Sequence, residues 1–278
     1  MRLCTIADKN GHESAAVVVS DGVVMVDDIN QHFSANWPTD VFSLLQRGLD
    51  LVLNEQAHAL SVNQSRQNFS FKPLYRHCRK IIGIGLNYLD HAKDLNAPHP
   101  TEPASFMKGD NTIIGFGDPI SLPSQSKRVT AEAELAVVIG KTCKGVSENE
   151  AMSCVAGFCL VIDMTAEDIL KRNPRFLTKA KNFDTFFSFG PELITPDELP
   201  DILSLRVGTW KNGELYRENT ISNMAFQPAY LVSHFSDIST LYPGDIISTG
   251  TPGAIPISSG DEVECRVAGF KSLINTVA

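Results

Sequence analysis

Short apolar runs of strand length, separated by turn signals, dominate the chain from residue 81 onward. We predict strands over residues 81–86, 112–114, 133–139, 155–162, 203–210, 245–249 and 263–267. Turn-forming sequences such as YPGD at 242–245 and SGD at 259–261 separate these runs. Helical patterns here cover only residues 147–152 and 224–235, and they do not alternate regularly with the strands. The pattern predicts an α+β fold that is mainly β, and it disfavours a doubly wound sheet.

The first seventy or so residues have a different pattern. Residues 15–26 read as two strands joined by Asp21-Gly22, which is a strong hairpin signal. Residues 41–53 have the apolar spacing of a short amphipathic helix, and the polar residues 54–68 predict its end and a connection. We therefore divide the chain into a small N-terminal α+β domain, residues 1–72, and a larger domain, residues 73–278. The small domain is too short for a robust core of its own, so we expect it to pack against the larger one.

Composition and charge narrow the classes of partner. The chain has 278 residues, with 24 Lys and Arg against 32 Asp and Glu, and thus a net charge of −8. This acidic balance argues against a nucleic-acid partner, because phosphate backbones need a basic surface. The apolar stretches are too short for a signal peptide or a membrane span. The six cysteines form no C-x-x-C pair, which is typical of free thiols, so we expect a cytoplasmic protein that does not bind membranes.

Three carboxylates are candidates for a metal site. Glu132 and Glu134 lie two residues apart where a predicted strand opens, so both side chains point to the same face if the strand includes Glu132. Asp163 follows the apolar run AGFCLVI at 156–162 and lies at the end of that strand. Oxygen ligands of this kind suit Mg²⁺, Mn²⁺ or Ca²⁺. The alternative is that Glu132 and Glu134 face water on a half-exposed strand, and that Asp163 only marks the turn at which its strand ends.

Two further features carry possible chemistry. His91 and Asp94 are three residues apart in NYLDHAKDL, where a carboxylate can orient an imidazole that activates water. The alternative for this pair is a surface contact without a role in catalysis. The run STGTPG at 248–253 can offer backbone N–H groups to a carboxylate, or it is simply a tight turn. Gly83 and Gly85 lack the third glycine of a dinucleotide-binding motif, so we reject that interpretation.

Together these residues resemble the fumarylacetoacetate hydrolase family. The resemblance covers nearly all of residues 80–278, in seven motifs that follow one another in the family's order. They are GLNYLDHA (85–92), ASFMKG (104–109), AEAELAVVIGK (131–141), AGFCLVIDMTAED (156–168), KNFDTFFSFGP (181–191), LYPGDIISTGTPG (241–253) and GDEVECRVAGFKSLINTV (260–277). Within the family, LVIDMTAED is most similar to the acylpyruvase and oxaloacetate decarboxylase branch.

The resemblance implies a fold, a cofactor and a set of residue roles. It implies a mixed β-sandwich roll that carries a small N-terminal α+β domain, binds one Mg²⁺ or Mn²⁺ ion (with Ca²⁺ possible) and forms a homodimer. The implied metal ligands are Glu132, Glu134 and Asp163. The implied catalytic residues are His91, Asp94 and Lys181, and the implied substrate contacts are Lys108, Gly250 and Thr251.

The chain departs from the family pattern at three positions. Asp94 stands where Glu is common, and Glu167 stands where the family's DMTARD-like stretch has Arg. Arg217 stands near a position where a substrate-binding Gln is frequent. An Arg there can bind a second substrate carboxylate in a bidentate manner, which favours a dicarboxylate substrate.

The leading functional expectation is a divalent-metal-dependent hydrolase. It would cleave a C–C bond in a β-diketo or acylpyruvate-like 2-oxo acid through a metal-stabilised enolate. One alternative keeps the site and changes the reaction, to oxaloacetate decarboxylation or to isomerisation or hydration of an unsaturated 2-oxo diacid, as in a 5-carboxymethyl-2-hydroxymuconate isomerase. The other alternative is a non-catalytic relic that binds a small metabolite. The partner in every case is a small-molecule acid.

Overall fold

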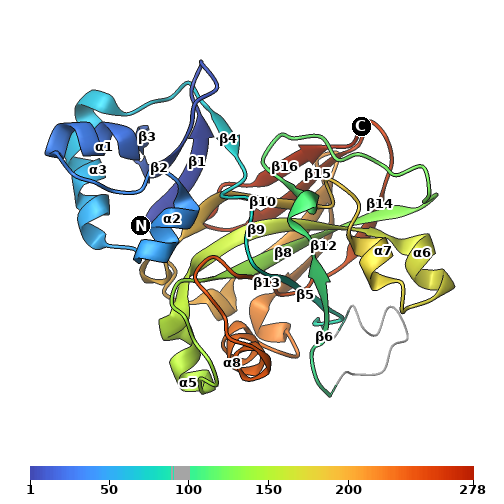
Figure 1. The fold of residues 1–278 in the computed structure, drawn as a ribbon. Coiled ribbons are helices and arrows are strands. Elements are labelled where there is room, and N and C mark those ends of the chain that lie inside the picture. Colours follow the sequence, from blue (N-terminus) through green and yellow to red (C-terminus); the bar gives the residue numbers. More distant parts are fainter. Residues whose placement is uncertain (89, 91–100) are drawn as a thin grey trace.

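The computed structural model describes residues 1–88, 90 and 101–278 (Figure 1). Its strands in chain order are β1 (Arg2–Ala7), β2 (Glu13–Val19), β3 (Gly22–Met25), β4 (Ser70–Lys72), β5 (Ile81–Gly85), β6 (Ala104–Lys108), β7 (Ile113–Ile114), β8 (Val129–Ile139), β9 (Val155–Ala166), β10 (Phe187–Ile194), β11 (Arg206–Lys211), β12 (Glu214–Thr220), β13 (Ile246–Ser248), β14 (Ala254–Ile257), β15 (Glu262–Val267) and β16 (Leu273–Thr276). The α-helices in the same residues are α1 (Val26–Phe33), α2 (Val41–Arg47), α3 (Leu51–Gln64), α5 (Glu148–Ala151), α6 (Glu167–Arg172), α7 (Leu177–Lys181) and α8 (Pro228–Ile238).

Two sheets contain these strands. The larger sheet has the order β3-β2-β1-β10-β9-β8-β13-β5-β6, with β14 beside β8, β4 beside β1 and β7 beside β10. The smaller sheet has the order β12-β11-β15-β16. Most neighbouring strands are antiparallel, whereas β13 runs parallel to β5 and β7 parallel to β10. The prediction of an α+β fold that is mainly β is confirmed.

The N-terminal strands continue the large sheet. The hairpin predicted at Asp21-Gly22 joins β2 to β3, and β1 pairs with β10, with Leu3 opposite Leu193. Leu3, Leu44 and Leu193 belong to one buried apolar cluster, so the first seventy residues pack against the rest of the chain through a shared core. The domain boundary at residues 72/73 stays a prediction.

The helices of the N-terminal region differ from the predicted pattern. The single helix expected over residues 41–53 is two helices, because Gly48 has a φ of +94° and ends α2. The side chain of Asp50 then accepts a hydrogen bond from the Val52 N–H and caps α3. The interpretation of residues 54–68 as a helix end and connection is wrong over most of its length, since α3 extends to Gln64. Its polar sequence forms a helix because Leu53, Ala57 and Leu60 are buried against the cluster.

Strands β8 and β9 form the centre of the larger sheet. They pair over almost their whole length, with Glu132 opposite Asp163. Odd-numbered residues of β8, such as Leu135 and Val137, lie in one apolar cluster, and the even-numbered Ala136 and Val138 lie in another. Strands buried on both faces hold their side chains rigidly, and that rigidity is what a site built on β8 and β9 needs.

The helices predicted after residue 81 are present with shifted bounds. Ser147 and Glu150 form the predicted capping box at the start of α5. The helix expected over residues 224–235 begins at Pro228, because Pro is favoured in the first turn of a helix. Helices α6 and α7 follow β9 and pack on β8 and β9, beside β6, so they lie near the carboxyl end of β9 (Figure 1). Within the described residues, no helix combines the length and apolar character needed to cross a membrane.

Candidate metal centre and active-site cleft

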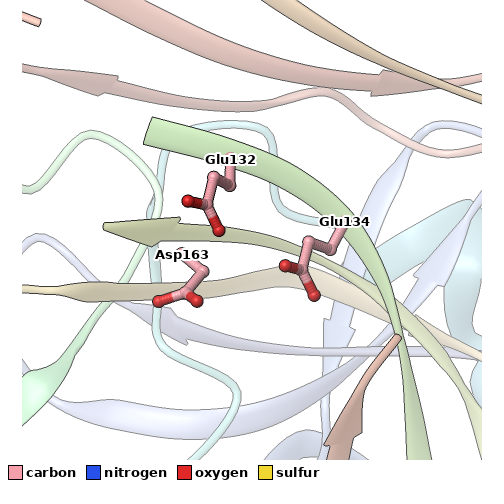
Figure 2. A group of neighbouring side chains, drawn as sticks. All are labelled: Glu132, Glu134 and Asp163. Atoms are coloured by element: carbon pink, nitrogen blue, oxygen red, sulfur yellow. The ribbon is translucent and has the colours of Figure 1, made fainter. Parts of the chain in front are cut away.

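The three predicted metal ligands meet on the central strand pair. Glu132 and Glu134 come from β8, and their side chains share a face because strand side chains alternate. Asp163 on β9 lies directly opposite Glu132 in the register. Figure 2 shows the three carboxylates turned toward one another from the two neighbouring strands. One oxygen from each lies within 4.8 Å of the others.

Burial and chemistry fit these carboxylates to a divalent cation. Glu134 and Asp163 are almost fully buried, and Glu132 is only slightly exposed. Three negative charges held this close repel one another unless cations lie between them. An all-oxygen set of carboxylates is the donor type preferred by Mg²⁺, Mn²⁺ and Ca²⁺. The donor set therefore fits the predicted cofactor class, although it does not select one metal.

Two lysines neutralise part of this charge. Lys181, at the end of α7, donates to Asp163 Oδ2 at 2.6 Å and to Glu132 Oε2 at 2.9 Å. Lys108, at the end of β6, donates to Asp163 Oδ1 at 2.6 Å and to the Lys181 carbonyl oxygen. Both ammonium groups are buried. When all five groups are ionised, three carboxylates and two ammonium groups leave a net charge of −1, which favours one further cation.

The ionisable groups at this site have shifted pKa values. Burial, followed by repulsion from Asp163 and Glu132, raises the pKa of Glu134 to about 8. Burial alone would lower the pKa of Lys181, but Asp163 and Glu132 raise it above its usual range. Burial lowers the pKa of Lys108 despite the opposing charge of Asp163. Lys181 thus stays protonated. Glu134 holds its proton more tightly than an ordinary carboxyl group, and a metal cation bound beside it would displace that proton.

The turn after β13 holds Glu134 in place. Glu134 Oε2 accepts hydrogen bonds from Ser248 Oγ at 2.6 Å and from the Gly250 N–H at 2.8 Å. Gly250 has a φ of +97°, and a Cβ there would lie 2.8 Å from Asn87 Cβ, so only glycine fits. The expectation that residues 248–253 can offer a backbone N–H to a carboxylate is therefore met at Gly250, whose N–H donates to the Glu134 side chain. The Thr251 hydroxyl lies 3.2 Å from the Gly253 carbonyl oxygen, and the predicted substrate contacts of Gly250 and Thr251 stay predictions.

A cleft of about 470 Å³ lies beside the carboxylate cluster and is bordered by Glu132. Glu132 lines its inner end, and Thr165 beside it donates to Glu132 Oε1 at 3.0 Å. The remainder of the lining mixes the polar and charged Arg128, Thr130, Glu167, Lys171 and Arg217 with the less polar Leu170, Tyr216, Gly253 and Ala254. The predicted substrate-binding Arg217 thus lies in the same cleft as Glu132. Its side chain runs over Gly253, where a Cβ would come within 2.5 Å of Arg217 Cγ.

Sequence reasoning missed several residues of this site, among them Thr130, Thr165, Ser248, Lys171 and Arg128. Strand alternation is a signal that could have found Thr130 and Thr165. Thr130 lies two residues from Glu132, and Thr165 two residues from Asp163, so each shares a face with a predicted metal ligand. Ser248 and Lys171 have no such signal, since their positions depend on how β13 and α6 pack on β8 and β9. His91 and Asp94, the predicted catalytic pair, lie outside the described residues.

Comparison with known proteins agrees with this geometry. The model of the fumarylacetoacetate (FAA) hydrolase C-terminal family matches residues 80–278. The chain belongs to the fumarylacetoacetate hydrolase family. The motifs quoted above fall within the matched residues, and so do Glu132, Glu134, Asp163 and both lysines.

Relatives of this family member include enzymes of several kinds. A mitochondrial oxaloacetate tautomerase of Rattus norvegicus is 35% identical over 270 residues, which are 93% of this chain and 85% of the relative. A 5-carboxymethyl-2-hydroxymuconate delta-isomerase from Mycobacterium smegmatis is 28% identical, with a TM-score of 0.77 over 100% of this chain and 98% of the other. A maleylpyruvate hydrolase from Sphingobium, solved with manganese(II) and pyruvate, is 26% identical, with a TM-score of 0.82 over 100% and 99%. The chain is therefore a member of an enzyme family, with that family's fold.

Proposed function

We propose that this protein is a divalent-metal-dependent enzyme that converts a 2-oxo acid through its enolate. The observation that carries the proposal is the buried cluster of Glu132, Glu134 and Asp163, with Lys181 and Lys108 beside it. A divalent cation bound there supplies Lewis-acid stabilisation of the negative charge that develops on an enolate. The manganese(II) and pyruvate found in the maleylpyruvate hydrolase structure support both the cofactor and the 2-oxo acid class.

The residues of this chain have distinct roles in the proposal. Glu132, Glu134 and Asp163 hold the cation, and Ser248 with the Gly250 N–H fixes the orientation of Glu134. Lys181 stays protonated because two carboxylates face it, so its ammonium group donates a hydrogen bond to an oxygen on which negative charge develops. Burial of this end of the cleft excludes water and strengthens each of these interactions.

Keto–enol conversion is the first reaction that we propose for this site. It moves one proton between carbon and oxygen, and a 2-oxo acid with acidic hydrogens beside its carbonyl group undergoes it without any attacking water. The identity of 35% to an oxaloacetate tautomerase over 93% of the chain supports this reaction. Oxaloacetate is therefore the first substrate to test, and loss of CO₂ from it would indicate the decarboxylase alternative.

Hydrolytic C–C cleavage of a β-diketo acid is the second candidate. The similarity to maleylpyruvate hydrolase over the whole chain favours it. This reaction needs an activated water, for which His91 and Asp94 are the predicted groups. Their roles rest on the sequence resemblance.

A substrate panel tests the proposal. Metal-stripped protein is incubated with oxaloacetate, acetylpyruvate and fumarylpyruvate, each with EDTA or with added Mg²⁺ or Mn²⁺. Metal-dependent enol–keto conversion of oxaloacetate supports tautomerisation, release of CO₂ supports decarboxylation, and two acid products from either diketo acid support hydrolysis. Absence of any metal-dependent reaction across the panel would contradict the proposed enzyme and favour a metabolite-binding protein.

A further inference from the structure

The side chain of Asn87 connects three segments that are distant from one another in the sequence. Asn87 follows β5 by two residues and is fully buried. Its Nδ2 group donates to the Thr249 carbonyl oxygen at 2.7 Å, in the turn after β13, and to the Phe226 carbonyl oxygen at 2.9 Å, just before α8. Its Oδ1 atom accepts a hydrogen bond from the Phe226 N–H at 2.9 Å. The orientation of the amide is therefore fixed, because the reverse orientation would set like groups against one another at all three contacts.

One peptide unit joins Asn87 to the carboxylate cluster. The carbonyl oxygen that Asn87 contacts and the N–H group of Gly250 belong to the same peptide, between Thr249 and Gly250. In a trans peptide these two groups point in opposite directions. This peptide thus accepts a hydrogen bond from Asn87 on one side and donates to Glu134 Oε2 at 2.8 Å on the other. A hydrogen bond to the carbonyl oxygen also polarises the peptide and strengthens its N–H as a donor.

The backbone of the turn does not by itself fix this peptide. Thr249 is held through its N–H and its hydroxyl, which both donate to the Leu135 carbonyl oxygen, but these bonds do not involve the peptide that follows. Gly250 has a φ of +97°, and glycine adopts negative φ about as readily. Rotation of one peptide by about 180° separates type I from type II turns, whose second central residue has φ of about −90° or about +80°. The same rotation is therefore open to the Thr249–Gly250 peptide.

The amide of Asn87 opposes this rotation. In the rotated orientation the Gly250 N–H would face the Nδ2 donor of Asn87, and the Thr249 carbonyl oxygen would face the Glu134 carboxylate. Two favourable contacts would thus become two repulsive ones, and Glu134 would lose a charge-assisted hydrogen bond. The paired hydrogen bonds with Phe226 keep the Asn87 amide in place while it opposes the rotation.

We propose that Asn87 is a positioning residue for the metal centre, whose amide holds the Thr249–Gly250 peptide in the orientation that directs the Gly250 N–H at Glu134. The inference rests on the proposed function, because the Glu134 carboxylate has to hold a divalent cation. It adds a residue that acts on a ligand through one peptide. Changes to groups that orient a metal ligand typically lower metal affinity by about 10–100-fold.

Titration of EDTA-stripped protein with Mn²⁺, followed by calorimetry, tests this proposal. Asn87→Asp keeps the size of the side chain and an acceptor for the Phe226 N–H, but it replaces the donor that faces Thr249 by a carboxylate oxygen. This oxygen repels the Thr249 carbonyl oxygen and attracts the Gly250 N–H, so it favours the rotated peptide. We expect the Mn²⁺ affinity to fall about tenfold or more. A carboxylate that acted only through its charge would raise the affinity for a cation instead.

Asn275→Asp is the matched control. Asn275 is also fully buried, and its Nδ2 group donates to the carbonyl oxygens of Gly115 and Asp118 at 2.7 and 2.8 Å. It lies on β16 in the smaller sheet, outside the carboxylate cluster. Both variants replace a buried amide donor that faces two carbonyl oxygens, so both should lower Tm. Only Asn87→Asp should weaken Mn²⁺ binding, and Asn275→Asp should stay within about twofold of the original affinity.

The backbone of Gly250 provides a second measurement, which a purely structural role of Asn87 would not change. In a crystal structure of metal-free Asn87→Asp, φ of Gly250 should change from +97° to about −90°, with its N–H directed away from Glu134. Asn87→Ala removes the donor without adding a carboxylate, so its Mn²⁺ affinity should fall by less. This variant carries the same titration if Asn87→Asp does not fold.

Three outcomes would overturn this inference alone. They are Mn²⁺ affinity in the Asn87 variants equal to that of the original protein, a loss no greater than that in Asn275→Asp, and weakened binding with Gly250 in its original orientation. Failure of the original protein to bind Mn²⁺ would instead overturn the proposed function. The two failures are therefore distinguishable.

Discussion

The buried carboxylate cluster on β8 and β9, here the inner end, and the cleft beside Glu132 that Arg128, Lys171 and Arg217 line, here the outer end, are built in opposite ways. At the inner end, Asp163 and Lys181 are buried and bind each other, and Glu134 accepts hydrogen bonds from Ser248 and Gly250. At the outer end, Lys171 is largely exposed, and the hydroxyl of Thr130 has no partner among the described residues. One strand pair therefore carries a preorganised charged cluster at one end and a loosely filled surface at the other.

This difference suits the inner end to the chemical step and the outer end to the choice of substrate. Buried charges at short distances interact strongly, so small changes at the inner end have large effects on both charge balance and stability. Solvated charges interact weakly, so the outer end can change between family members at little cost. Glu167 and Arg217, two of the three departures from the family pattern, lie at the outer end.

Removing a metal ligand should have the largest effect. In Glu134→Ala, we expect metal-dependent turnover to fall about a thousandfold or more, because the cation loses a carboxylate ligand at the reacting centre. Steady-state kinetics with the substrate found in the panel measures this loss. Glu262→Gln, an exposed acid on β15 outside the cleft lining, is the matched control and should retain full activity. Full activity in Glu134→Ala would contradict the ligand assignment.

Removing the shared counter-ion should have the next largest effect, on stability. Asp163→Asn leaves the buried ammonium groups of Lys108 and Lys181 without their common carboxylate. We expect the free energy of unfolding of metal-free protein to fall by about 3–5 kcal/mol, measured by denaturant unfolding. The double variant Asp163→Asn, Lys108→Met also removes one of the two unpaired ammonium groups. It should therefore recover part of the lost free energy of unfolding. An unchanged midpoint in the single variant would show that these lysines are hydrated rather than buried.

The pH dependence of stability provides a third, intermediate test of the inner end. Because the pKa of Glu134 is raised from 4.5 to about 8, the metal-free folded protein holds a proton there that the unfolded chain releases. The folded state thus binds more protons between these pH values, and the free energy of unfolding falls as pH rises from about 5 to about 8. Tm should drop by several degrees over this range. Glu134→Gln should flatten the slope, and an equal slope in both proteins would contradict the assignment.

The smallest expected effect lies at the outer end. Lys171→Gln removes one exposed cation, so we expect the affinity of Mn²⁺-loaded protein for a 2-oxo diacid such as 2-oxoheptanedioate to fall only about two- to fivefold, with oxalate binding unaffected. The loss should shrink further at high salt, because exposed charges are screened. Lys179→Gln, an exposed lysine on α7 outside the cleft lining, is the control. A loss of about tenfold or more would show that Lys171 interacts strongly with the bound diacid and would contradict a weakly interacting outer end.

The sequence predicts the inner end far better than the outer end. Strand alternation places Glu132 and Glu134 on one face, and the family resemblance adds Asp163 to them as a third ligand. The predicted strand ends at residue 162, whereas Asp163 lies inside β9. Strand β10, by contrast, is absent from the predicted strands, because its run FSFGPELI contains Gly190 and Pro191, which interrupt a strand pattern. Lys171 and Arg217 meet in one cleft only through the packing of α6 and β12, which no local pattern encodes.

Direct metal binding tests the central claim of this account. Protein stripped with EDTA is titrated with Mn²⁺ by calorimetry, alongside Glu134→Ala and the Glu262→Gln control. We predict one Mn²⁺ per chain for the original protein and the control, release of protons on binding near pH 7, and loss of binding in Glu134→Ala. Equal Mn²⁺ binding by Glu134→Ala and the original protein would contradict the claim that Glu132, Glu134 and Asp163 hold the metal.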